Sequence, residues 1–80
     1  MASRLGITTD LEVAKWELSQ QFKNTRNWRS TPPFEDQKMA LEWVNKKSEE
    51  LKCKTVGAIK GPKTNKIRWF GFVFEHDGPR

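Results

Sequence analysis

Residues 67–75 read Ile-Arg-Trp-Phe-Gly-Phe-Val-Phe-Glu, and this stretch decides the fold. Its β-branched and aromatic side chains favour a strand, and residues 53–60, Cys-Lys-Thr-Val-Gly-Ala-Ile-Lys, favour a second one. The segment between them contains Gly61, Pro62 and Asn65, which are typical of a turn. We therefore predict a C-terminal β-hairpin with a basic connecting loop.

Alternation along the two strands divides this predicted hairpin into two faces. With Lys60 opposite Ile67, one face carries Cys53, Thr55, Gly57 and Ile59 opposite Arg68, Phe70, Phe72 and Phe74. Because it holds three phenylalanines and no lysine, we expect this face to be the core that the helices cover. The other face places Trp69 beside Lys54 and Lys60, and we expect it to stay open.

A first helix is predicted over about residues 10–23. Residues 9–12, Thr-Asp-Leu-Glu, fit a capping box, in which the Thr and Glu side chains satisfy free backbone N–H groups. Helical spacing then gives an apolar stripe, which Val13 and Trp16 are expected to widen. The stripe consists of Leu11, Ala14, Leu18 and Phe22.

A second helix is predicted to begin near Glu35 or Asp36, since acidic side chains suit the positive end of a helix dipole. Its apolar stripe consists of Ala40, Trp43, Val44 and Leu51. Between the helices, residues 24–33 are rich in turn formers and end in two prolines. This segment has room for a short edge strand around Trp28.

These elements predict an α+β fold, with two helices packed on one face of a small antiparallel sheet built around the C-terminal hairpin. Eighty residues form one small domain, residues 1–80, with residues 1–8 and 76–80 expected to be loose. A chain of this length buries roughly 60% of the surface that it exposes when unfolded. It therefore has room for one thin core and for no deep catalytic cleft.

Composition excludes several classes of protein. No apolar run approaches the roughly 18 residues of a membrane span, and the N-terminus lacks the apolar segment of a secretory signal. One Cys and one His allow neither an internal disulfide nor a closed zinc site. We therefore expect a cytoplasmic protein with no metal, no cofactor and no membrane contact.

The net charge of +5 is concentrated in residues 23–33 and 52–80. Such asymmetry favours a basic face for a polyanion, although lysines also serve simply to keep a small protein in solution. We predict a nucleic-acid-binding module in which cations hold phosphates and Trp69 stacks on a base. The expected site residues are Lys54, Lys60, Lys63, Lys66, Arg68, Trp69, Arg26 and Arg29.

Two alternatives for the Trp69 face stay open. The N-terminal arm with Leu5 and Ile7, or the Trp28 segment, could fold over this face and bury it. The face could instead bind a protein partner or a second copy of the chain, because aromatic side chains anchor such interfaces. The rival function is therefore a small protein-binding adaptor or inhibitor.

Residues 68–73, Arg-Trp-Phe-Gly-Phe-Val, are similar to the RNP1 motif of RNA-recognition (RRM) domains. The resemblance implies that Phe70 and Phe72 stack on bases. Trp69 stands where that family has Gly, Glu75 stands where it has an aromatic residue, and the helix and strand that follow the motif there are missing here. The likeness covers about six residues, and no family is assigned from it.

No arrangement of residues predicts catalysis. Residues 57–64 resemble a phosphate-binding P-loop, but the glycine spacing is one residue short and Pro62 lacks an N–H. Cys53 and His76 are the only thiol and imidazole in the sequence, and Cys53 is expected to be an inert core thiol. We therefore expect a protein that is not an enzyme.

Overall fold

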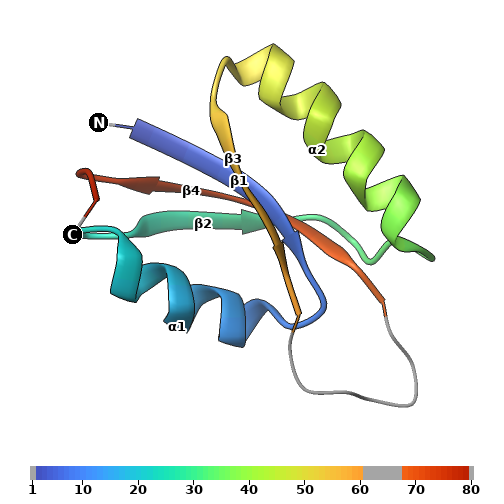
Figure 1. The fold of residues 1–80 in the computed structure, drawn as a ribbon, viewed down its shortest axis with the longest axis horizontal. Helices are drawn as coiled ribbons and strands as arrows, with labels where there is room; N and C mark the ends of the chain where they lie inside the picture. Colours follow the sequence, from blue (N-terminus) through green and yellow to red (C-terminus); the bar gives the residue numbers. More distant parts are fainter. Residues whose placement is uncertain (1, 61–67, 80) are drawn as a thin grey trace.

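The computed structural model describes residues 2–60 and 68–79, and it confirms the α+β class. The chain forms two helices and a four-stranded sheet, and the twist of the sheet is visible in Figure 1. In chain order the elements are β1 (Ala2–Thr8), α1 (Leu11–Gln21), β2 (Arg26–Ser30), α2 (Gln37–Leu51), β3 (Lys54–Ile59) and β4 (Phe70–His76). The short edge strand expected around Trp28 is therefore present as β2.

The sheet is mixed, with strand order β2-β4-β1-β3. β1 pairs parallel with β3 and antiparallel with β4, and β2 is antiparallel to β4. The two C-terminal strands exist as predicted, but β1 lies between them. The prediction that β3 and β4 pair directly as a hairpin is therefore wrong. Residues 1–8 were expected to be loose, whereas Ala2–Thr8 forms one of the two central strands.

β1 lies in the middle of the sheet, and its second half, from Leu5 to Thr8, is buried. Leu5 and Ile7 point to one face of the sheet, and Gly6 between them lies against the other. A Cβ atom at Gly6 would stand 2.7 Å from the carbonyl oxygen of Gly57 and 2.9 Å from the ring of Phe72. Glycine therefore allows this close approach of the neighbouring strands.

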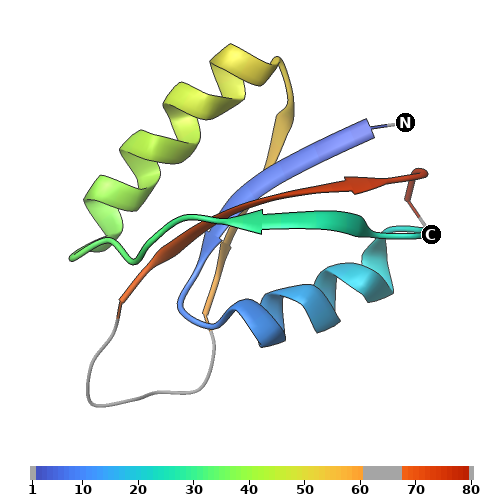
Figure 2. The same cartoon turned by 180° about the vertical axis from the view of Figure 1, so that it is seen from behind.

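The helices lie on opposite faces of the sheet, not on one face as predicted, and both views of the fold show this (Figure 1; Figure 2). The chain runs from β1 through α1 to β2 at one edge, then back through α2 to β3 at the other edge. Crossovers between parallel strands are nearly always right-handed. Reversing the direction of travel along the sheet therefore moves the second helix to the other face.

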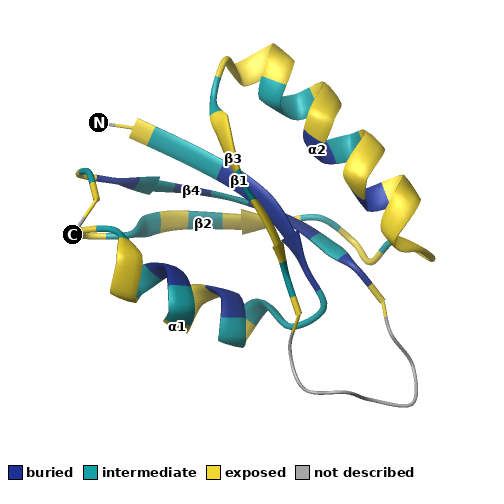
Figure 3. Cartoon of the chain, in the orientation of Figure 1, coloured by how far each residue is buried: buried dark blue, intermediate teal, exposed yellow. Residues whose placement is uncertain are grey.

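Each face has its own apolar layer, and both helices turn their buried side toward the sheet (Figure 3). The α1 layer is built on Ala14, Leu18, Phe72 and Phe74, with Leu11, Phe22, Trp28, Val56 and Ile59 packed against them. The α2 layer is built on Leu5, Ile7, Ala40, Val44 and Trp69, with Phe34, Trp43, Cys53 and Val73 packed against them. The expected core role of Phe72 and Phe74 is thus confirmed.

A bulge in β3 explains one error in the predicted faces. Thr55 pairs with Leu5 and Ala58 with Ile7, so the register shifts between these pairs at Gly57, whose φ is +83°. An extra residue in a strand changes which side chains share a face. Cys53 therefore packs in the α2 layer, although it was expected beside the phenylalanines, whereas Ile59 packs beside Phe72 and Phe74 in the α1 layer as expected.

Aspartates begin both helices. The Asp10 carboxylate accepts hydrogen bonds from the backbone N–H groups of Glu12 and Val13, at 3.0 and 3.3 Å. Asp10 is therefore the N-cap where the sequence favoured a Thr9 capping box. Asp36 caps α2 in the same way, accepting from Met39 N–H at 2.9 Å, as the acidic start of that helix predicted.

Candidate nucleic-acid interface

A groove opens on the α2 face, where the helix leaves β2 and the end of β4 uncovered. α2 packs mainly on β1, β4 and β3. The groove has a volume of about 580 Å³ and lies between this helix and β2. It is lined by Ser3, Asn27, Arg29, Ser30, Thr31, Trp43, Lys47, Leu51, Cys53, Val73 and Glu75.

Trp43 forms the aromatic wall of this groove and is half-buried. A Cβ atom at Gly71 would stand 2.5 Å from the Cζ3 atom of Trp43, so the indole lies directly on the backbone of β4. The Phe34 ring lies 6.2 Å away, measured between ring centroids. These contacts hold the indole in one orientation, while its remaining surface lines the groove.

Arg29 supplies an unneutralised cation at the edge of the groove. It is exposed on β2 opposite Val73, and its guanidinium has no hydrogen bond or ion pair within residues 2–60 and 68–79. Lys47, on the helix side, pairs with Glu50 at 3.1 Å, so its charge is partly balanced. The Glu75 carboxylate accepts a hydrogen bond from the Asn27 side-chain amide. The free positive charge of the groove therefore lies at Arg29.

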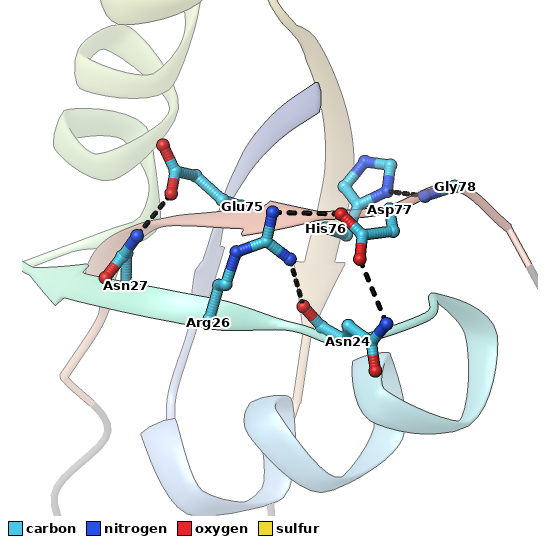
Figure 4. A network of polar contacts seen from close by, with 7 residues as sticks. All are labelled: Asn24, Arg26, Asn27, Glu75, His76, Asp77 and Gly78. Carbon is cyan, nitrogen blue, oxygen red and sulfur yellow. Dashed lines mark hydrogen bonds and ion pairs between the residues drawn. The ribbon is translucent and has the colours of Figure 1, made fainter. Parts of the chain in front are cut away.

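Arg26 has a different environment from Arg29, although both are predicted site residues. Its Nη2 lies 2.9 Å from Oδ1 of Asp77, and its Nη1 donates to the Asn24 carbonyl oxygen at 2.8 Å (Figure 4). Asn24 donates to the same Asp77 carboxylate at 2.9 Å. Hydrogen bonds from Asn24 and then Arg26 lower the pKa of Asp77 below its ordinary value of 3.8. This ion pair connects the residues that follow β4 to β2. Because the Arg26 charge is already paired, Arg26 is less suited to contact a phosphate.

The other predicted cations do not form one compact patch. Lys54 is exposed at the start of β3 and Lys60 is exposed one residue after its end, about 20 Å away at the ordinary rise of a strand. Arg68 is exposed just before β4. Lys63 and Lys66 lie outside the described residues. The structure thus brings only Arg29, of the predicted site residues that it describes, to the groove.

The expectation that Trp69 stays open for stacking is wrong. Trp69 is 4% exposed, packs with Leu5, Ile7 and Val44, and forms a backbone bridge with Phe34. The face of Trp69 is therefore buried, as the first alternative held, but Leu5 and Ile7 contact Trp69 from β1 within the sheet rather than from an arm folded over it, and α2 is the element that covers the face. Phe72 is fully buried in the α1 layer, so the open stacking surface implied by the RNP1 resemblance is also not present.

Cys53 and His76 lie on opposite sides of the sheet. Cys53 packs in the α2 layer, and its thiol donates to the Leu51 carbonyl oxygen at 3.2 Å. His76 is 1% exposed, with its ring centroid 4.5 Å from that of Phe22, and its Nδ1 accepts from Gly78 N–H at 2.9 Å (Figure 4). Among the residues with described positions, no group of three or more His, Cys, Asp or Glu could hold a metal ion.

Comparison with known proteins gives no relative: no family model, curated protein or solved structure matches this chain. No helix in the described part of the chain is long and apolar enough to span a membrane.

Sequence reasoning missed Trp43 as a candidate site residue because it fits the apolar stripe of α2. The available signal was its spacing from Lys47, four residues later on the same side of the helix. An aromatic residue at the margin of a stripe, one turn before a cation, indicates a partly open position rather than the centre of a core.

Proposed function

We propose that this protein is a non-enzymatic module that binds nucleic acid through its exposed cations. The observation that carries the proposal is that Arg29, Lys54, Lys60 and Arg68 are exposed and have no anionic partner within the described parts of the chain. Their charge is therefore free to meet phosphates. The net charge of +5 supports the same conclusion.

A salt titration tests this proposal. If these four cations contact a single strand, the logarithm of the affinity should fall with the logarithm of salt concentration with a slope of about −3. Binding of a fluorescent oligonucleotide, followed by anisotropy at several salt concentrations, measures the slope. Replacing Lys54 and Lys60 together by Gln should reduce it by about one unit or slightly more.

Lys46→Gln is the matched control, because Lys46 is exposed on α2 and does not line the groove. It should change the slope by clearly less than half of the change that the Lys54 and Lys60 pair causes, since a single lysine that contacted a phosphate would account for about half of it. Absence of binding at low salt by protein that is shown to be folded would overturn the proposal.

A protein-binding role is the second candidate, and one observation favours it. Trp16 on α1 is 67% exposed, and tryptophan is a frequent anchor of protein interfaces. This surface lies on the opposite side of the sheet from the groove. Sedimentation of the free protein tests self-association, and loss of a dimer in Trp16→Leu would support this role.

A further inference from the structure

We propose that the groove between α2 and β2 binds an unpaired base of a single-stranded nucleic acid, with the base against Trp43 and its phosphate at Arg29. This inference rests on the proposed nucleic-acid binding and adds its site and the form of its ligand. Three properties of the groove carry it: an immobilised indole, a cation without a partner, and a size that suits a nucleotide.

The indole of Trp43 is prepared to receive a flat ring. The backbone of Gly71 fixes one part of it, and Phe34 restrains it further, so little side-chain freedom remains to be lost on binding. Bases stack on such aromatic platforms whatever their sequence, because every base has a π-face. The buried Trp69 offers no such surface.

The charges and polar groups of the groove suit a nucleotide. Arg29 is exposed and unpaired, and guanidinium groups bind phosphate with two parallel hydrogen bonds. Asn27 and Glu75 line the same groove and are hydrogen-bonded to each other, which leaves the Asn27 carbonyl oxygen and the second Glu75 oxygen to accept from the edge of a base. Apolar surface from Val73 and Leu51 completes the lining.

The size of the groove favours a single base over a duplex. Its volume of about 580 Å³ falls in the range of small-ligand sites, roughly 300–1,000 Å³. A base within a duplex is stacked and paired, so it does not enter a recess, whereas the bases of a single strand can turn outward. The structure therefore points to single-stranded ligands.

Two probes separate base recognition from attraction between charges. Oligo(dT) of about 12 nucleotides, within the site sizes of single-strand-binding folds, is compared with an oligomer of equal length and charge that carries no bases. Wild-type protein should bind oligo(dT) about tenfold more tightly than the abasic oligomer, since one stacked base contributes roughly that factor or more. Equal binding of the two probes would overturn this inference and leave the proposed function standing.

Variants then show which residues produce the preference for oligo(dT) over the abasic oligomer. Trp43→Leu should remove most of the difference between the probes, and Arg29→Gln should weaken both probes alike. Trp16→Leu is the matched control, because Trp16 is the exposed tryptophan on the other side of the sheet. It should keep the full preference for oligo(dT).

Other results of these measurements would overturn the groove as the binding site. Persistence of the preference in folded Trp43→Leu, or its loss in Trp16→Leu, would overturn the groove as the site. If Trp43→Leu does not fold, the wild-type comparison of probes and Arg29→Gln still test the inference. Failure of both probes to bind at low salt would overturn the proposed function together with this site, and a dimer in sedimentation would then favour the protein-binding role.

Discussion

The two faces of the sheet differ in how completely a helix closes them. On the α1 face, Trp28 stacks on Phe74 with ring centroids 4.4 Å apart and an interplanar angle of 15°. Lys15 lies above Trp28, with its Nζ 6.0 Å from the ring centroid, and covers that layer from outside. On the α2 face, Trp43 forms one wall of a groove. The aromatic side chains therefore form a closed core on the α1 side and line an open groove on the α2 side.

The difference arises from where the covering elements run. Trp28 lies on β2 itself, so it fills the α1 face at the edge of the sheet. On the α2 face no aromatic side chain of β2 does this, and the helix packs over the centre and the β3 side. Arg29 consequently projects where a core side chain would otherwise be needed.

Large truncations in both layers should produce the largest effects. Phe72→Ala removes a fully buried ring and should cost about 3–5 kcal/mol, which is most of the stability of a small domain. Trp69→Ala should cost a similar amount, because Trp69 is also buried. Denaturant unfolding of both variants measures these values. A cost below about 1 kcal/mol for Trp69→Ala would show that the α2 face is not a core.

Substitution of two glycines by alanine should produce effects of intermediate size and should distinguish a loss of stability from a loss of binding. Gly71→Ala places a Cβ against the Trp43 ring and should cost about 1–3 kcal/mol while weakening the preference for oligo(dT). Gly57→Ala meets no atom within 4 Å, but its φ of +83° should cost roughly 1 kcal/mol.

Gly57→Ala is therefore the control for Gly71→Ala, since it strains the sheet away from the groove. It should leave oligonucleotide binding unchanged. Equal loss of the oligo(dT) preference in the two variants would mean that general loosening of the sheet, rather than displacement of Trp43, explains the effect.

The smallest effect should come from the exposed network at Asp77. Its pKa is lowered in the folded protein by Asn24 and Arg26, so its contribution to stability is complete above the ordinary value of 3.8. That contribution is lost as the pH falls through the lower folded pKa. The midpoint of denaturant unfolding should therefore fall less between neutral and acidic pH in Asp77→Asn than in wild type. An identical pH dependence in the two proteins would contradict the role of this network.

Local patterns in the sequence predicted most of the elements but not their arrangement. The periodicity around Ala14 and Leu18, the acidic start at Asp36 and the aromatic run of β4 identify their elements because these signals are local. β1 was missed because Leu5 and Ile7 are its only large apolar residues and Gly6 between them suggests a loop. Its insertion between β3 and β4 depends on pairing across the whole chain, which no short segment encodes.

The candidate site was predictable only in part for the same reason. Arg29 could be proposed from charge alone, since a basic segment between helices favours a surface position. The burial of Trp69 depends on β1 and α2, which are distant from it in the sequence. The opening beside Trp43 depends on the path of α2 across the sheet, so residue type and spacing alone could not distinguish it from core.

The central claim is that nucleic acid binds the α2 face while the α1 face stays closed, and the four tryptophans report on it directly. The indole N–H resonance of each can be followed by NMR during titration with oligo(dT). We expect the largest shift at Trp43, with Trp16, Trp28 and Trp69 little changed, since Trp16 and Trp28 belong to the α1 side and Trp69 is buried. A shift centred on Trp16 or Trp28, with Trp43 unaffected, would contradict the account.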